Sequence, residues 1–100
     1  MPPSSGDRGR TLDELRERID QLDAELIRLL NERAACALEI GRTKVSLGLE
    51  VYQPGREHEV LRRVRERNPG PLDGEAVTRL FERIIEEARR LEQIDAQDRR

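Results

Sequence analysis

Apolar residues recur at alternating steps of three and four along the first half of the chain, which is the spacing of one apolar stripe on an α-helix. The stripe consists of Leu12, Leu15, Ile19, Leu22, Leu26, Leu29, Arg33, Cys36 and Ile40. The helix is predicted to begin near Thr11, a candidate N-cap with Glu14 three residues later. It should end near Leu47, before Gly48. At 1.5 Å per residue, this helix would measure roughly 54 Å.

Two shorter helices are predicted in the second half of the chain. The first begins at Pro54, with Gln53 as its N-cap, and reaches about Arg67. Residues 68–71 (NPGP) break the chain. Asp73 then caps a third helix with its own apolar stripe. The pattern therefore predicts an all-α protein with one long and two shorter helices.

The two ends of the chain lack such periodicity. Residues 1–10 concentrate Pro, Ser, Gly and charge, which is typical of a disordered tail. The third helix is expected to fray from about Gln93. We therefore predict one domain over residues 11–97, with a frayed end at 98–100.

A cation occupies a core position of the long helix. Arg33 continues the apolar stripe, and none of its neighbours one turn away is acidic. A guanidinium cannot lose its proton, and burying it without a partner is costly. An anion from another helix or from a ligand must therefore meet Arg33.

Further charged residues fall on the inward faces of the predicted helices: Lys44, Arg56, Glu57 and Glu92. On a straight helix, Lys44 points within about 20° of Arg33. Arg16 lies about 100° away around the same helix. Arg16 therefore belongs to a different surface.

The long helix is expected to pair with a second copy of the chain. Two short helices cannot cover one face of a roughly 54 Å rod along its whole length. The economical partner for the remaining stripe is the same chain in a homodimer. Arg16 could then reach the site of the partner.

Each charge also has a purely structural interpretation. Arg16 could pair with Asp20, and Arg33 could form a buried salt bridge with Glu92. The first-turn charges of the second helix could be solvated, and Lys44 could extend its amine past the stripe. Taken together, however, three or four cations facing one or two acids suit a small dianion.

Composition excludes several classes of function. The 100 residues are 40% charged with a net charge of −2 and only two aromatics, which argues against a nucleic-acid binder. Cys36 is the single cysteine and His58 the single histidine, so no disulfide or metal site is expected. No apolar run is long enough to span a membrane. We expect a cytoplasmic protein without cofactor or metal.

The sequence resembles the all-helical (AroQ-class) chorismate mutases over roughly residues 11–95. The segments that carry the resemblance are 15–20 (LRERID), 31–33 (NER), 39–44 (EIGRTK), 52–57 (YQPGRE) and 80–87 (LFERIIEE). Each motif alone is weak, whereas the ordered set at these spacings is strong.

The resemblance implies an intertwined homodimer that converts chorismate to prephenate for Phe and Tyr biosynthesis. The substrate would contact Arg16 of the partner chain and, within one chain, Arg33, Lys44, Gln53, Arg56, Glu57, Ala88 and Glu92. The cations would bind the two substrate carboxylates, with Arg33, Lys44 and Glu92 as catalytic residues. Lys44 and Glu92 would donate to the ether oxygen, and Glu57 would hold the ring hydroxyl.

The sequence departs from the family pattern at three of these positions. Gln53 stands where an acid is common, Ala88 replaces a frequent serine, and Glu92 replaces a frequent glutamine. A related branch uses this fold to release pyruvate from isochorismate, which is the closest enzymatic alternative. A non-enzymatic helical dimerisation module is the other alternative. Arg33 and Gly41, which should weaken a helical seam, count against that module.

Overall fold

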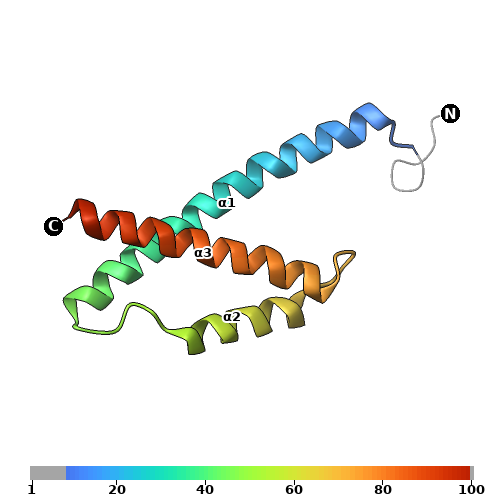
Figure 1. The fold of residues 1–100 in the computed structure, drawn as a ribbon. Coiled ribbons are helices and arrows are strands. Elements are labelled where there is room, and N and C mark those ends of the chain that lie inside the picture. Colours follow the sequence, from blue (N-terminus) through green and yellow to red (C-terminus); the bar gives the residue numbers. More distant parts are fainter. Residues whose placement is uncertain (1–8, 100) are drawn as a thin grey trace. The chain divides into compact units, whose positions relative to one another are not determined.

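The structure is a computed structural model, and it describes residues 9–99. The described part contains three helices and no strand: α1 (Leu12–Ser46), α2 (Pro54–Arg67) and α3 (Gly74–Asp98) (Figure 1). The predicted all-α class is confirmed. Helix α3 runs to Asp98, so the expectation of fraying from about Gln93 was wrong. Residues 1–8 of the predicted tail, and Arg100, lie outside the described residues.

Helix α1 has the ends that its sequence predicts. At its start, the backbone N–H of Glu14 donates to Oγ1 of Thr11 at 3.1 Å, and that hydroxyl donates to Oε1 of Glu14 at 3.2 Å. After its end, Gly48 has a φ of +72°, a left-handed conformation that a glycine adopts without steric cost.

The two shorter helices begin where predicted but are capped differently. Pro54 occupies the first turn of α2, and Gln53 at the N-cap makes no side-chain hydrogen bond. At the start of α3, Oδ1 of Asp73 accepts from the N–H of Ala76 at 2.7 Å. The start of α3 is therefore fixed by a charged cap, whereas that of α2 depends on proline geometry.

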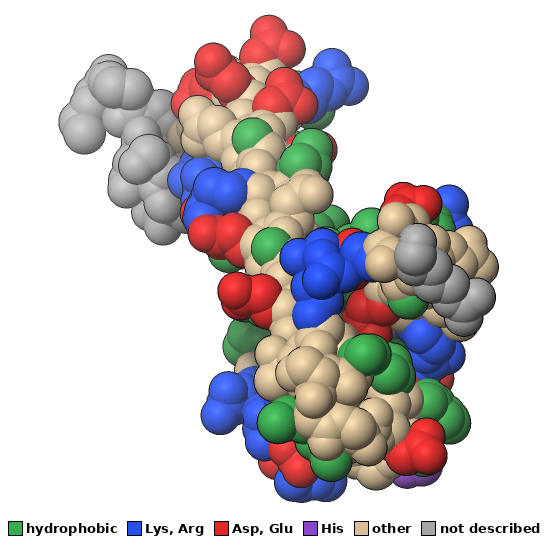
Figure 2. All heavy atoms as spheres, turned by 90° about the vertical axis from the view of Figure 1, so that its left-hand side faces the viewer, with side chains coloured by type: hydrophobic (Ala, Val, Ile, Leu, Met, Phe, Trp, Pro, Cys, Tyr) green, Lys and Arg blue, Asp and Glu red, His purple; other side chains and the backbone are tan. Residues whose placement is uncertain are grey.

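The contacts divide the chain into two units, residues 1–32 and 33–100. The described part of the first unit is the N-terminal portion of α1. In the second unit, α2 packs against α3, and Val77 is the buried apolar residue of the described chain. Hydrophobic side chains are visible at the surface among charged ones (Figure 2). One chain therefore has a thin interior.

The apolar stripe of α1 is not covered by its own chain. Six of its side chains in the first unit are 40–62% exposed: Leu12, Leu15, Ile19, Leu22, Leu26 and Leu29. Such a row of exposed aliphatic side chains is typical of a surface that binds another protein. Across the described residues, no helix is apolar over a stretch long enough to cross a membrane.

We predict that replacing Asp73 weakens the fold through the α3 cap. Asp73→Ala removes the acceptor for the Ala76 N–H, and loss of such a cap costs about 1 kcal/mol of unfolding free energy. Asp73→Asn keeps a side-chain oxygen as acceptor and should therefore retain most of the wild-type stability. Urea unfolding at one fixed protein concentration measures the stability of both variants. Equal unfolding midpoints for wild type and Asp73→Ala would contradict the role of the cap.

Candidate functional site

Helices α1 and α3 approach each other at a glycine. Gly41 is buried, and a Cβ atom at this position would lie 3.4 Å from Cδ of Glu92 and 3.5 Å from its Oε2. The Glu92 carboxyl group therefore lies against the backbone of α1. Helix α1 continues through Gly41 to Ser46, in agreement with the helix predicted to reach about Leu47. A Cβ atom at residue 41 would be in ordinary van der Waals contact with Glu92.

An ion pair fixes this approach on one side. Arg42 donates from Nε to Oδ2 of Asp95 at 3.0 Å and from Nη2 to Oδ1 at 2.6 Å. Such two-point pairing is directional. It lowers the pKa of Asp95 below its usual value. Asp95 lies one turn beyond Glu92, so the pair orients the segment of α3 that carries Glu92.

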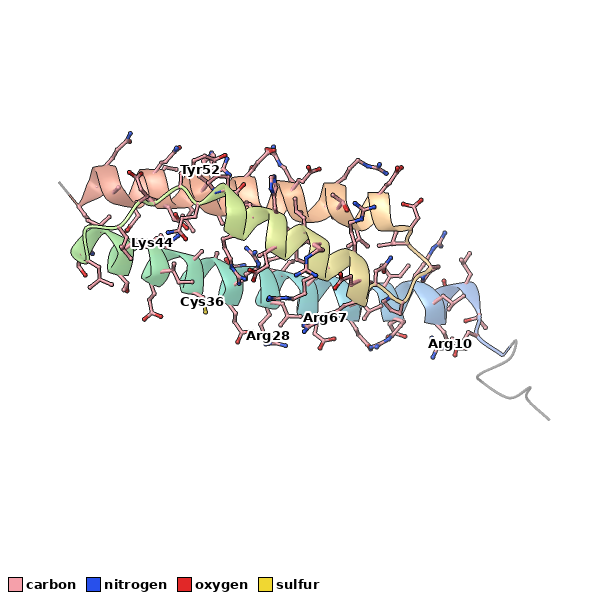
Figure 3. All side chains as sticks on the ribbon, turned by 90° about the horizontal axis from the view of Figure 1, so that it is seen from below. Arg10, Arg28, Cys36, Lys44, Tyr52 and Arg67 are labelled. Atoms are coloured by element: carbon pink, nitrogen blue, oxygen red, sulfur yellow. The ribbon has the colours of Figure 1, made fainter. Side chains whose placement is uncertain are left out.

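Lys44 extends from α1 toward the linker between α1 and α2 (Figure 3). Its Nζ donates to the backbone oxygen of Val51 at 3.2 Å. Burial raises the pKa of Glu92, while the positive charges of Lys44 and Arg89 oppose that rise. The net direction, which the sequence could not provide, is upward.

Glu57 is bound by a residue that the sequence analysis overlooked. Nη2 of Arg89 donates to Oε2 of Glu57 in an ion pair between α3 and α2. The Arg89 guanidinium also lies over the ring of Tyr52, 5.1 Å from its centroid. One signal could have identified Arg89: it precedes Glu92 by three residues and therefore lies near the same face of α3.

Two of the structural interpretations are not realised in the described residues. Arg33 is half-buried, and no ion pair joins it to Glu92. Arg16 is exposed and is not paired with Asp20. Within the described chain, Arg16 and Arg33 therefore keep their charges available.

The other predicted residues lie on the first turn of α2 and on α3. Nη1 of Arg56 lies 2.5 Å from Oε1 of Glu59, and Gln53 is exposed. Ala88 is half-buried on α3. The structure thus brings together Lys44, Glu57 and Glu92 with Arg89 in the second unit. Arg56 is occupied by a neighbour on its own helix.

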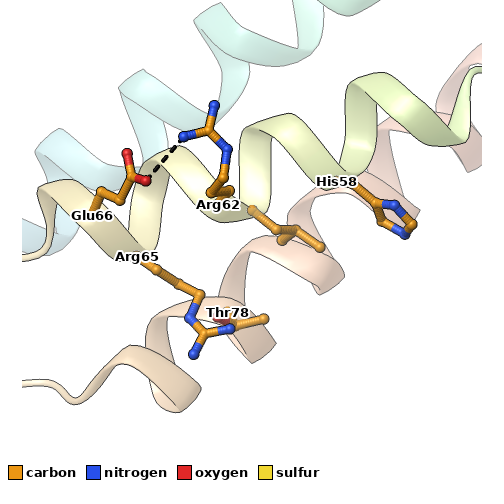
Figure 4. A pocket seen from close by; sticks show the side chains of 6 residues that line it. His58, Arg62, Arg65, Glu66 and Thr78 are labelled. Carbon is orange, nitrogen blue, oxygen red and sulfur yellow. Dashed lines mark hydrogen bonds and ion pairs between the residues drawn. The ribbon is translucent and has the colours of Figure 1, made fainter.

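Two hollows differ in their relation to these residues. The first lies between α2 and α3 and is lined by His58, Leu61, Arg62, Arg65, Glu66 and Thr78 (Figure 4). It contains none of the predicted site residues, and Arg62 within it is paired with Glu66 at 2.9 Å. The second lies along α1 and is lined by Cys36, Glu39, Ile40, Thr43 and Lys44. It includes Lys44 and none of the other predicted site residues.

Among residues 9–99, no group of three or more His, Cys, Asp or Glu residues is placed to hold a metal ion. The site is instead a set of cations and carboxylates, able to bind an anion and to donate hydrogen bonds.

Comparison with known proteins gives a consistent result. The family model for chorismate mutase type II matches residues 15–93. The bifunctional chorismate mutase/prephenate dehydratase of Neisseria gonorrhoeae is 49% identical over 82 residues, covering 78% of this chain and 22% of that protein. The corresponding protein of Pseudomonas aeruginosa is 44% identical over 84 residues, covering 79% and 23%. The chain therefore spans about a fifth of the length of these relatives.

Solved structures match over almost their whole length. Chorismate mutase (Form II) from Thermus thermophilus has a TM-score of 0.80 at 39% identity, covering 82% of this chain and 93% of that one. Chorismate mutase from Helicobacter pylori in complex with prephenate has a TM-score of 0.78 at 34% identity, covering 86% and 93%. The predicted family resemblance is confirmed.

The environment of Glu92 predicts a measurable titration. Its carboxyl pKa should lie above the ordinary value because burial outweighs the nearby cations. Lys44→Met removes one of these cations and should raise the pKa further. Carbon-13 NMR of the Glu92 carboxyl group measures both values. A Glu92 pKa at or below the ordinary value of a glutamate would contradict the burial argument.

Proposed function

The chain belongs to the chorismate mutase type II family, and we propose that it converts chorismate to prephenate. The observation that carries this proposal is that the charge of Lys44 acts on the half-buried carboxyl group of Glu92. Residues from distant parts of the sequence come together at Gly41, where the lysine charge acts on a carboxyl group of raised pKa. When Glu92 is protonated, the lysine and the carboxylic acid are both hydrogen-bond donors.

The reaction explains why such a site suffices. In this intramolecular rearrangement the ether carbon–oxygen bond breaks while a carbon–carbon bond forms in the same molecule, so no co-reactant is needed. The enzyme must hold the flexible substrate in its reactive, chair-like shape. It must also stabilise the negative charge that develops on the ether oxygen. Neither task requires a nucleophile.

We assign the residue roles accordingly. Lys44 and protonated Glu92 donate to the ether oxygen, and Glu57 accepts from the ring hydroxyl. The two substrate carboxylates are bound by arginines, whose planar guanidinium groups match carboxylate geometry. The full proposed contact set is Arg33, Lys44, Gln53, Arg56, Glu57, Ala88 and Glu92, with Arg16 from a second chain. Arg56 would exchange its neighbour Glu59 for the substrate.

We further propose that the active form is a homodimer. Six aliphatic side chains of the α1 stripe in the first unit are exposed in one chain, and full burial of a leucine contributes roughly 1.5–3 kcal/mol. The free energy gained by covering this stripe would exceed that of the surface ion pairs, which contribute about 0–1 kcal/mol each. A second α1 presents the same stripe, so the surface can bind itself. Arg16 would enter the partner's site.

An assay with purified protein tests the proposed reaction against its alternatives. We expect chorismate to disappear with formation of prephenate. Arg33→Ala should lower kcat/KM on the order of a hundredfold through loss of a charged contact, with little change in melting temperature. Arg28→Ala, which removes an exposed arginine paired with Glu32, is the matched control. If the protein releases pyruvate from isochorismate and does not convert chorismate, the lyase alternative is favoured. If it reacts with neither substrate, the dimerisation module is favoured.

Subunit exchange tests the contribution of Arg16. Arg16→Ala and Lys44→Ala chains should each be nearly inactive alone. After mixing, activity should return to about a quarter of wild type, because half of the dimers are mixed and one of their two sites is intact. Native mass spectrometry confirms that exchange has occurred. If mixed dimers form without any recovery of activity, Arg16 does not act across the interface.

The pH dependence of the rate tests Glu92. Only the protonated carboxyl group can donate a hydrogen bond, so kcat should fall as pH rises through the pKa of Glu92 in the complex. The raised pKa moves this fall toward neutral pH. Glu92→Gln, a permanent donor, should flatten the profile between about pH 5 and 8. A wild-type profile that Glu92→Gln leaves unchanged would exclude Glu92 from the mechanism.

A further inference from the structure

Arg89 lies where three segments of the chain meet. It is half-buried on α3, next to Ala88 and three residues before Glu92. Its guanidinium binds Glu57 of α2 and lies over the ring of Tyr52 in the linker. None of the residue roles assigned above includes Arg89, although it contacts one proposed substrate ligand and lowers the pKa of another.

The contact with Glu57 involves one of its two carboxylate oxygens. Nη2 of Arg89 donates to Oε2, whereas Oε1 accepts no hydrogen bond from a described residue. A carboxylate held in this way has a fixed orientation and still has one oxygen available as an acceptor. The charge of Arg89 also offsets that of Glu57, which would otherwise repel a dianionic substrate.

The ring of Tyr52 restricts the guanidinium from its other side. The cation lies 5.1 Å from the ring centroid, within the range of an attractive cation–π contact. The linker that carries Tyr52 is itself fixed to α1, because Lys44 donates to Val51. The position of Arg89 therefore depends on α1 as well as on α2 and α3.

We propose that Arg89 is a positioning residue that orients Glu57 so that its Oε1 accepts the substrate hydroxyl. This inference rests on the proposed function. A purely structural tie between α2 and α3 is the competing explanation. The pair is partly exposed, with 39% of the Arg89 side chain and 28% of the Glu57 side chain accessible, and such pairs contribute little to stability. A structural role and a positioning role therefore predict different measurements.

A double-mutant cycle with chorismate separates these roles. Arg89→Met keeps a long side chain without charge and should raise KM, lowering kcat/KM on the order of tenfold to a hundredfold. In the Glu57→Gln background, Arg89→Met should lower kcat/KM by less than about threefold, because the side chain that Arg89 orients is already altered. Arg89→Lys keeps the charge but not the planar group, so its kcat/KM should lie between those of wild type and Arg89→Met.

Two further substitutions are controls for the arginine and its stacking partner. Arg90→Met alters the adjacent arginine, whose side chain is 68% exposed, and should leave kcat and KM unchanged. Tyr52→Phe keeps the ring and should behave as wild type, whereas Tyr52→Leu should raise KM in the direction of Arg89→Met. All variants should melt within a few degrees of wild type, as expected for surface changes.

The outcomes are distinguishable from a failure of the proposed function. Equal losses for Arg89→Met with and without the Glu57 substitution would overturn the positioning role. If the loss of kcat/KM among the variants only follows their loss of melting temperature, the positioning role is also overturned, and Arg89 is a structural tie between α2 and α3. If the wild-type protein does not convert chorismate, the proposed function is wrong, and the inference about Arg89 is overturned with it.

Discussion

The position of the Glu92 carboxyl group against Gly41 is the contact on which the arrangement of the site depends. A methyl group at residue 41 would just touch the Glu92 side chain, and a longer one would occupy its place. Glycine inside a helix costs about 0.5–1 kcal/mol relative to alanine. The neighbouring pair of Arg42 and Asp95 is partly exposed, and such pairs contribute little to stability. Stability alone therefore gives little reason for this local sequence, whereas the placing of a carboxyl group within the influence of the Lys44 charge does.

A single chain has only a thin apolar interior. Val77 is the buried apolar residue of the described chain, while the leucines and isoleucines of α1 remain largely exposed. The charged groups of the second unit are consequently only partly shielded, and their pairing is directional rather than strongly stabilising. In the proposed dimer, any exclusion of water from these groups would strengthen their interactions.

The sequence predicted the helices because helix formation here follows local signals. The three-and-four spacing, the Asp73 cap and the turn at Gly48 each act within a few residues. The pairing of Arg89 with Glu57 depends instead on how α2 packs against α3, which no local pattern encodes. The approach of Glu92 to Gly41 likewise depends on how α3 packs against α1. The length of α3 was underestimated because Asp95 is held by Arg42 of another helix.

The charges of the site bear directly on the protonation of Glu92. Arg89 is paired with Glu57, whereas Arg33 has no ion-pair partner among residues 9–99, and the charge of Lys44 acts on the Glu92 carboxyl group. Lys44 and Arg33 are therefore cations that an incoming anion could engage. A dianion bound there would engage these cations and add negative charge near the Glu92 carboxyl group. Both effects disfavour its ionised form, so substrate binding itself would raise the pKa further. In the proposed reaction, the donor form of Glu92 would then be favoured when the substrate occupies the site.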